Sequence, residues 1–477
     1  MSKPTRRAFL ATSAAFVAAV TAHSVAWPTR FAMASTNDPN VQKMIEAVTA
    51  GDLATATDLI AQSPDLVQTR DTKGLSVFAL SLLHGHPQIG AAIRGAGYEL
   101  DLHEAALALD WERLATLAEP DPMQVNSFHA IGGSAMWAAA RGGAGSQMWR
   151  VYQYGGDPDL TPQDGYSPLR AALDLPDLAT AEMTAAALLS NNASANTVEP
   201  DLQTGLHLAA ARGSSELVEI FIRKGADLDA LDPQGRTAQD LAEQNGHSAA
   251  ANILRNHSNI PRDFSAQKRT RDSNEQPYTV PDFGRISLPE RSKFVGASHG
   301  RMAEIQRLTK VDPRYAHSVA TTDEAAVEAG AHMGNQDIVN MLLEFGASYD
   351  LTTVVMRGDV STLKSRLKAE PRLIHERGAH DFPMLWYPVI GGELLECTEI
   401  LLDAGADIER QHFLGNTALH YAVLGGQLEM TALLLERGAD PNRISRKFSG
   451  DGITPLGLAE QRKHAAVAQL LRDRGAL

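Results

Sequence analysis

Apolar residues along this chain recur in pairs of short amphipathic helices. Residues 204–254 show the pattern clearly, because Leu206 and Ala209 line one side of a first helix that ends near Gly213. A second helix follows, with apolar residues at positions i, i+1, i+4 and i+5: Leu217, Val218, Phe221 and Ile222. One such pair cannot bury its apolar face alone, so the pattern predicts a stack of helix pairs.

The helix pair is a repeat that occurs thirteen times. With the residue equivalent to Leu206 as a marker, the repeats lie at Met44, Phe78, Leu102, Met136, Leu169, Leu206, Gln239, Lys293, Val327, Leu351, Leu385, Leu419 and Leu456. The spacings are 34, 24, 34, 33, 37 and 33 residues before the long gap, and 34, 24, 34, 34 and 37 after it. Both series share a short step and a long step, at an offset of 249 or 250 residues. The chain is therefore predicted to be a tandem duplication of a six-repeat block, with the Gln239 repeat added at the junction.

The stretch TGLHLAAARG, followed by Gly-Ala-Asp at 225–227, resembles ankyrin repeats. The resemblance covers nearly all of the chain after residue 40, although the repeats at Lys293, Val327 and Leu351 match the pattern poorly. It implies an all-α ankyrin-repeat solenoid, in which first helices and finger loops line a concave groove. Ankyrin-repeat proteins mostly bind other proteins through this groove and these fingers, so a protein-binding scaffold is the expected function.

Four segments follow from the repeats and from the composition between them. They are an export signal at 1–34, a first ankyrin block at 40–256, a linker or loop at 257–287 and a second ankyrin block at 288–477. The linker is polar and contains three prolines, so no helix is expected to continue through it.

The N-terminal segment has the layout of an export signal. Residues 1–34 carry four basic side chains and no acidic one, and an apolar run follows Arg6 and Arg7. The stretch TRRAFLA resembles the twin-arginine motif, and Ala34 ends an A-x-A cleavage site. An uncleaved membrane anchor is the alternative, but the run is rich in alanine and interrupted by His23. The mature chain is expected in the bacterial periplasm, exported already folded.

Charge and cysteine content exclude several classes of partner and site. Without the signal, 39 basic residues face 57 acidic ones, which disfavours nucleic acid and anionic lipid as partners. Cys397 is the single cysteine, so no internal disulfide can form, and its apolar neighbours predict a buried thiol. The chain is expected to be a monomer that meets the membrane only during export.

The stretch FPMLWYPVIGG at 382–392 departs from the repeat pattern. Trp386 replaces the motif histidine, and Trp137 does the same in the first block, 249 residues earlier. One interpretation is packing, because large aromatic residues fill space beside the short preceding repeat. The other is a binding site in the groove, since tyrosine and tryptophan are enriched in binding hot spots. The candidate binding residues are Trp386, Tyr387, Tyr421, Trp137 and His129.

An enzyme is the alternative function. His375, His380 and Asp381 precede the unusual helix and are weak candidates for a metal or acid/base cluster in the groove, serving a lyase or a hydrolase. The spacing of these residues is irregular, and the sequence contains no phosphate-binding glycine loop, paired cysteines or nucleophile elbow. No cofactor is therefore expected, and a binding scaffold is favoured over an enzyme.

Overall fold

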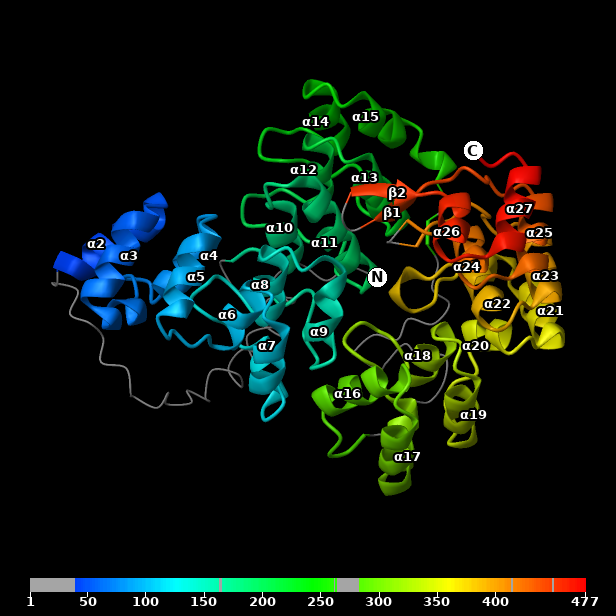
Figure 1. Ribbon diagram of the computed structural model, residues 1–477. Helices are drawn as coiled ribbons and strands as arrows, with labels where there is room; N and C mark the ends of the chain where they lie inside the picture. The colour runs from blue at the N-terminus through cyan, green and yellow to red at the C-terminus, as the bar shows by residue number, and fades with distance from the viewer. Residues whose placement is uncertain (1–38, 163–164, 261, 264–282, 413–414, 448–449) are drawn as a thin grey trace, which may run out of the picture. The chain divides into compact units, whose positions relative to one another are not determined.

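The computed structural model describes residues 39–477, except 163–164, 261, 264–282, 413–414 and 448–449 (Figure 1). The export signal predicted at 1–34 lies outside the described residues, as does most of the linker predicted at 257–287. In the part of the chain that is described, no helix combines the length and the apolar character needed to cross a bilayer.

The chain forms two compact units, Met1–Tyr98 and Glu99–Leu477. The first unit contains α2 (Pro39–Ala50), α3 (Leu53–Gln62), the 3-10 helix η1 (Pro64–Gln68), α4 (Val77–Leu83) and α5 (Pro87–Gly95). Helix α2 contacts α4 and α3 contacts α5, so the first two repeats stack in parallel layers.

The second unit begins with the rest of the first block. Its helices are α6 (Leu102–Leu107), α7 (Trp111–Ala118), η2 (Pro122–Asn126), α8 (Ala135–Arg141), η3 (Gly145–Met148), α9 (Trp149–Tyr152), α10 (Pro168–Leu173), α11 (Leu178–Ser190), α12 (Gly205–Ala211), α13 (Ser215–Arg223), α14 (Ala238–Gln244), α15 (Ser248–Arg255) and η4 (His257–Asn259). Contacts run from α6 to α8, α10, α12 and α14, which places the first helices of successive repeats in one row.

The second block lies entirely within the same compact unit. It contains α16 (Leu288–Ser298), α17 (Met302–Val311), η6 (Pro313–His317), α18 (Ala326–His332), α19 (Gln336–Glu344), α20 (Leu351–Met356), α21 (Val360–Ala369), η7 (Pro371–His375), η8 (Ala379–Asp381), η9 (Met384–Trp386), α22 (Tyr387–Ile390), α23 (Leu395–Asp403), α24 (Ala418–Leu424), α25 (Leu428–Glu436), β1 (Ser445–Lys447), β2 (Gly450–Ile453), α26 (Pro455–Gln461) and α27 (Ala465–Asp473). A second row of first helices runs from α16 through α18, α20, α22 and α24 to α26.

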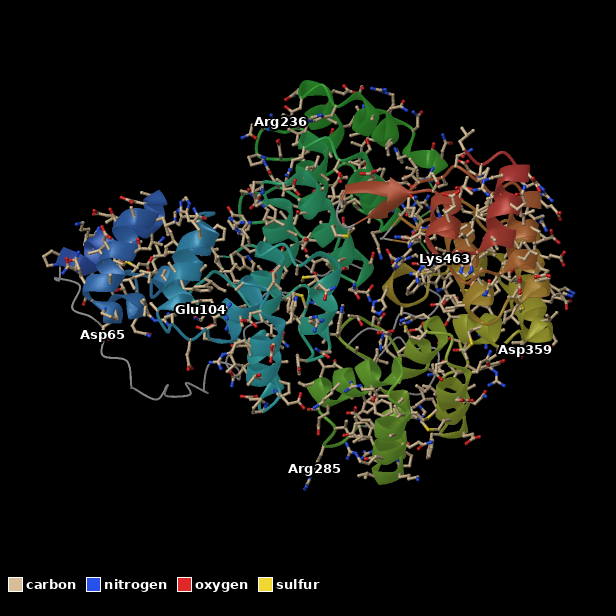
Figure 2. The ribbon with its side chains drawn as sticks, in the orientation of Figure 1. Asp65, Glu104, Arg236, Arg285, Asp359 and Lys463 are labelled. Carbon is tan, nitrogen blue, oxygen red and sulfur yellow. The ribbon has the colours of Figure 1, made fainter. Side chains whose placement is uncertain are left out.

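The predicted all-α repeat fold is confirmed, because each of the thirteen marker residues lies in a helical segment that begins a repeat. Side-chain caps explain where these short helices start. Asp101 and Glu104 form a capping box on α6, and Asp359 accepts the backbone N–H of Thr362 on α21 (Figure 2). The motif histidines bind backbone as expected: the Nε2 of His207 lies 3.1 Å from the carbonyl oxygen of Ala230.

Irregular features of the structure repeat at the same offset as the sequence. The 3-10 helices η1 and η6 begin 249 residues apart, as do η2 and η7. The isolated bridge Arg70–Ser76 has its counterpart at Val319–Ala325, again 249 residues later. A turn shape that is shared at this offset is difficult to explain by thirteen independent repeats, so these features support the predicted duplication.

The two 37-residue steps have different structures. In the first block the step contains α11, which has 13 residues where the second helices of neighbouring repeats have about nine. In the second block the step contains the antiparallel hairpin of β1 and β2 in the finger loop. Equal spacing therefore hides an elongated helix in one block and an elongated finger in the other.

The two blocks contact each other inside the second compact unit. Helix α11 of the first block contacts η8 of the second. The Nδ2 of Asn192 donates to the carbonyl of Thr322 over 2.8 Å, and the hydroxyl of Thr321 donates to the carbonyl of Gly156 over 2.8 Å. These contacts bring the C-terminal end of α11 beside the loops of the second block.

Candidate functional site

Three histidines and one glutamate converge where α16, α18 and η8 meet. His299 follows the last residue of α16, Glu324 lies in the loop before α18, His332 ends α18, and His380 belongs to η8. One donor atom from each residue lies within 4.8 Å of the donor atoms of the other three. We call these four residues the His/Glu cluster.

The carboxylate of Glu324 lies at the centre of the His/Glu cluster. Its Oε1 is 3.5 Å from the Nε2 of His299 and 3.2 Å from the Nδ1 of His332. Its Oε2 is 3.2 Å from the Nε2 of His380. The Glu324 and His332 side chains are 3% and 5% exposed, so most of this polar group lies away from water.

Backbone geometry directs His380 into the cluster. His380 has φ 55° and ψ 28°, and Asp381 has φ 64°, so two consecutive non-glycine residues adopt the left-handed region. This conformation is uncommon for residues with a Cβ atom and occurs preferentially at functional sites. It sends the His380 side chain toward Glu324, whereas Asp381 turns toward a different set of charges.

Burial and charge pairing set the protonation of the cluster. Burial raises the pKa of Glu324, but His380 and His299 outweigh that effect and hold it well below its ordinary value. Burial lowers the pKa of His332 to about 4, although Glu324 opposes this. Burial also lowers the pKa of His380, but Glu324 more than compensates and the pKa is raised. His332 is therefore neutral near pH 7.

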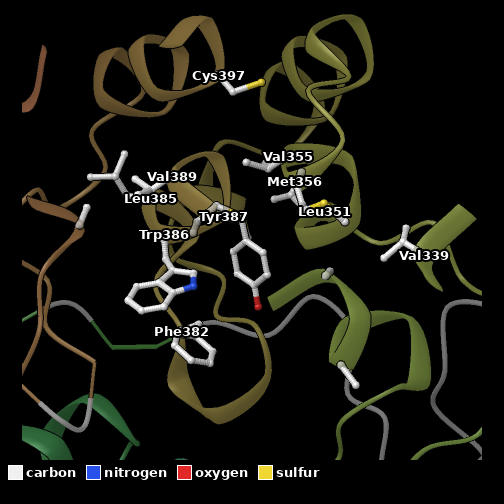
Figure 3. Close-up of a cluster of buried hydrophobic side chains, with 14 of the residues drawn as sticks. Val339, Leu351, Val355, Met356, Phe382, Leu385, Trp386, Tyr387, Val389 and Cys397 are labelled. Carbon is white, nitrogen blue, oxygen red and sulfur yellow. The ribbon is translucent and has the colours of Figure 1, made fainter. Parts of the chain in front are cut away.

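Aromatic rings line one side of the cluster. Phe382 stacks on His332 with ring centroids 5.1 Å apart, and on His412 with centroids 4.3 Å apart. The indole of Trp386 packs on the other edge of Phe382 at 4.6 Å (Figure 3). These rings keep water from one side of the imidazoles and restrict their rotation.

A buried network of charges lies beside the cluster. Asp381 pairs with Lys224 and Arg377, and it accepts a hydrogen bond from Ser190 over 3.2 Å. Asp263 pairs with Arg377 at 3.0 Å and with Arg410 at 2.9 Å. Lys224 and Ser190 belong to the first block, whereas the other partners of Asp381 belong to the second. The network therefore joins the two blocks by desolvated ion pairs.

The three catalytic candidates from the sequence do not form one site. His375 is exposed and borders a small cavity of about 40 Å³ that is also lined by Arg223 and Arg377. His380 joins the His/Glu cluster, and Asp381 joins the ion-pair network. The hypothesis of a shared acid/base cluster of His375, His380 and Asp381 is wrong, because the left-handed turn separates two of the side chains and the third faces solvent.

The expectation that Tyr387 presents its ring to the groove is wrong. Its side chain is 0% exposed and packs against Gly378, where an added Cβ would overlap the tyrosine hydroxyl. The physical reason is the broken helix: η9 ends at Trp386 and α22 starts at Tyr387, with Pro388 in its first turn. The change of helical register turns the ring inward (Figure 3).

The other binding candidates are buried or partly buried. Trp386 is 5% exposed and contacts Tyr421, whose pKa is raised to about 12 by burial. Trp137 is partly buried and packs on the backbone at Gly133, which favours the packing interpretation for the two tryptophans. His129 pairs with Asp101 at 3.1 Å and stacks on His103, and these contacts lie within the first block.

The sequence analysis did not identify His299, Glu324 and His332 as site residues. They are spread over 33 positions with no metal-ligand spacing, and His380 follows 48 positions after His332. One feature of the sequence did point to this region. The repeats at Lys293 and Val327, which contain all three residues, match the repeat pattern poorly.

The donor atoms of the cluster suit two kinds of chemistry. Imidazole nitrogens and a carboxylate can share protons as a buried ion-pair network. The same groups are the ligands that zinc, iron, nickel and copper take in proteins. The distances and the hydrogen-bond partners of the rings discriminate between these two possibilities.

Comparison with known proteins identifies the repeats. The family model of ankyrin repeats in three copies matches residues 178–264, 354–445 and 385–476. The matched segments cover the end of the first block and most of the second.

Three relatives show the same repeats in different proteins. The chain is 45% identical over 82 residues to a potassium channel AKT1 of Oryza sativa subsp. indica, covering 17% of this chain and 8% of the channel. It is 30% identical over 153 residues to a transient receptor potential cation channel subfamily A member 1 homolog of Caenorhabditis elegans, covering 32% and 12%. It is 32% identical over 128 residues to the mouse cyclin-dependent kinase 4 inhibitor B, covering 26% of this chain and 95% of the inhibitor. The chain thus spans about a tenth of each channel.

Proposed function

This chain belongs to the ankyrin-repeat family, and we propose that it is an exported scaffold that binds a protein partner through finger loops of its first block. Ankyrin repeats are protein-interaction modules, and the finer parts of this proposal are the export route, the surface and the chemistry of the partner.

Export rests on the N-terminal sequence. The pair Arg6 and Arg7 precedes an apolar run, and the segment ends in a small-residue cleavage site at Ala34. The route would deliver a folded scaffold to the periplasm, where a monomer with no internal disulfide would act.

A row of exposed apolar side chains supports the choice of surface, and this observation carries the proposal. Phe128, Val198 and Leu231 are 53%, 61% and 59% exposed and lie in the loops before α8, α12 and α14. The first helices of these repeats contact one another in series, so their loops follow one another along the same side. Exposed apolar residues that recur at this position are typical of an interaction surface.

Charge indicates the chemistry of the partner. The same loops expose the carboxylates of Asp159, Asp227 and Asp229, in a chain with a net charge of −14. Acidic groups among apolar side chains favour a protein surface that offers apolar side chains with lysine or arginine around them. Trp386 and Tyr387 are too buried to serve as its first contacts.

The test compares three forms of the protein as bait in a periplasmic extract. The wild-type chain is compared with the triple variant Phe128→Ser/Val198→Ser/Leu231→Ser. Val311→Ser is the control, because Val311 is 75% exposed and lies at the end of α17 in the second block. We expect a defined protein to be retained by the wild type and the control and to be lost from the triple variant. Retention of the same proteins by all three forms would refute the assignment.

A further inference from the structure

We propose that His299, Glu324, His332 and His380 bind one divalent first-row transition-metal ion of the zinc class. The proposal is independent of the finger-loop surface, because these four residues lie in the second block. It rests on the spacing of the donor atoms, on the hydrogen-bond partners of the rings and on burial.

The spacing of the donor atoms fits a single ion. Metal bonds to nitrogen and carboxylate oxygen are about 2.0–2.2 Å long, so two ligand atoms on a tetrahedral ion lie roughly 3.3–3.6 Å apart. The three histidine nitrogens lie 3.2, 3.2 and 3.5 Å from oxygens of Glu324. All four donor atoms fall within 4.8 Å of one another, which requires only small side-chain adjustments to surround one ion.

Two of the rings present a lone pair toward the centre. The Nδ1 of His299 lies 3.1 Å from the carbonyl oxygen of Val295, and the Nδ1 of His380 lies 2.5 Å from the Oδ1 of Asn191. Both acceptors require a proton on Nδ1, so in the neutral ring the Nε2 that faces Glu324 has no proton. A metal-binding histidine characteristically has its second nitrogen held by a carbonyl or carboxylate oxygen in this way.

The third ring lacks the geometry of a hydrogen bond. The Nδ1 of His332 and the Oε1 of Glu324 are buried and 3.2 Å apart, yet neither makes a hydrogen bond to any residue that the structure describes. Buried polar atoms are nearly always hydrogen-bonded, and exceptions need an explanation. A cation between the two atoms would satisfy both of them, together with the lone pairs of His299 and His380.

The donor set also indicates the class of ion and its role. Three imidazoles favour zinc, iron, cobalt, nickel or copper over calcium or magnesium, which prefer oxygen ligands. Four protein ligands are the complement of a structural zinc site. Such an ion would connect the end of α16, both ends of the α18 segment and η8, and would hold the left-handed turn at His380 in place.

The experiment measures metal binding by the untagged chain. The protein is stripped with a chelator, dialysed against Zn²⁺, and its bound metal is counted. Co²⁺ is then added to a stripped sample, and its visible absorption reports coordination by nitrogen. We expect one Zn²⁺ per chain, a rise in the melting temperature with Zn²⁺, and the spectrum of four-coordinate Co²⁺. Failure of the wild type to retain zinc, or equal retention of Ca²⁺ or Mg²⁺, would overturn the proposal.

Variants separate this site from other histidines on the surface. His332→Gln and His380→Gln should each weaken Zn²⁺ binding by more than about tenfold, whereas His375→Gln should leave it unchanged because that ring is exposed and outside the cluster. If these two variants fail to fold, His299→Gln replaces a ring that is 32% exposed and provides the same test. Circular dichroism establishes that each variant is folded. Unchanged affinity in a folded cluster variant would show that zinc binds elsewhere and that the four residues are only an ion-pair network.

Discussion

The Oδ1 of Asn191 lies 2.5 Å from the Nδ1 of His380, which joins residues 189 positions apart in sequence. Asn191 follows the last residue of α11 in the first block, and His380 lies in η8 of the second. The Nδ2 of Asn191 donates to the carbonyl of Ala187 over 2.6 Å, so the amide is fixed from both sides. One side chain of the first block thus sets the tautomer of a ring in the second.

Asn191→Ala should destabilise the protein by about 1–3 kcal/mol, because it leaves a buried imidazole N–H without its acceptor. The measurement is the urea midpoint followed by circular dichroism. Asn256→Ala is the matched control: this asparagine is exposed, and its change should stay within about 0.5 kcal/mol. Equal midpoints for the two variants would show that the Asn191–His380 contact adds no stability.

Tyr387→Ala should unfold the protein at lower temperature rather than act on binding alone. The ring is 0% exposed, and truncation of a buried aromatic side chain typically costs about 3–5 kcal/mol. Tyr166→Ala is the control, because that ring is 38% exposed. The two melting temperatures are compared by calorimetry. A Tyr387→Ala protein that melts with the wild type would show that the ring is not part of the core.

His420 should make the protein less stable as the pH falls from 6.5 to 4. Burial lowers the pKa of His420 to about 4, while its ordinary value is 6.5. Its Nδ1 lies 3.2 Å from the backbone nitrogen of Thr417 and must accept that proton, so a protonated ring would lose this bond. Because the unfolded chain takes up a proton that the folded chain refuses, up to about 3 kcal/mol is lost across this window.

The check on His420 is the dependence of the free energy of unfolding on pH. Urea titrations at pH 7 and at pH 4.5 are made on the wild type and on His420→Gln, which cannot titrate. The variant should be less stable at pH 7 but should lose less stability between the two pH values. Parallel losses in both proteins would assign the pH dependence to other groups.

Arg6→Lys with Arg7→Lys should leave the precursor in the cytoplasm, because the paired guanidinium groups are what distinguishes a twin-arginine signal from other basic N-terminal segments. The measurement is the distribution of the chain between cytoplasmic and periplasmic fractions. Lys3→Arg changes a neighbouring basic residue without touching the pair and should be exported normally. Periplasmic accumulation of the double variant would reject this route.

The sequence by itself determined the repeats, their short and long steps and the caps that start the helices. These features depend on contacts over a few residues, such as Asp101 with Glu104, and on an apolar pattern that only stacking can bury. The poor match of the repeats at Lys293 and Val327 also came from the sequence. It indicated where the array differs from its family, although it gave no chemical reason.

Only the tertiary structure decided which side chains meet. His299, Glu324, His332 and His380 come from three segments separated by 25, 8 and 48 positions, and the two blocks must pack before Asn191 reaches His380. The direction of Tyr387 depends on a break between η9 and α22 that shifts the helical phase, and the equal 37-residue steps conceal an elongated helix and a hairpin. Local pattern specifies helices because their hydrogen bonds are local, whereas a site built from loop ends depends on backbone turns and packing that no short stretch of sequence records.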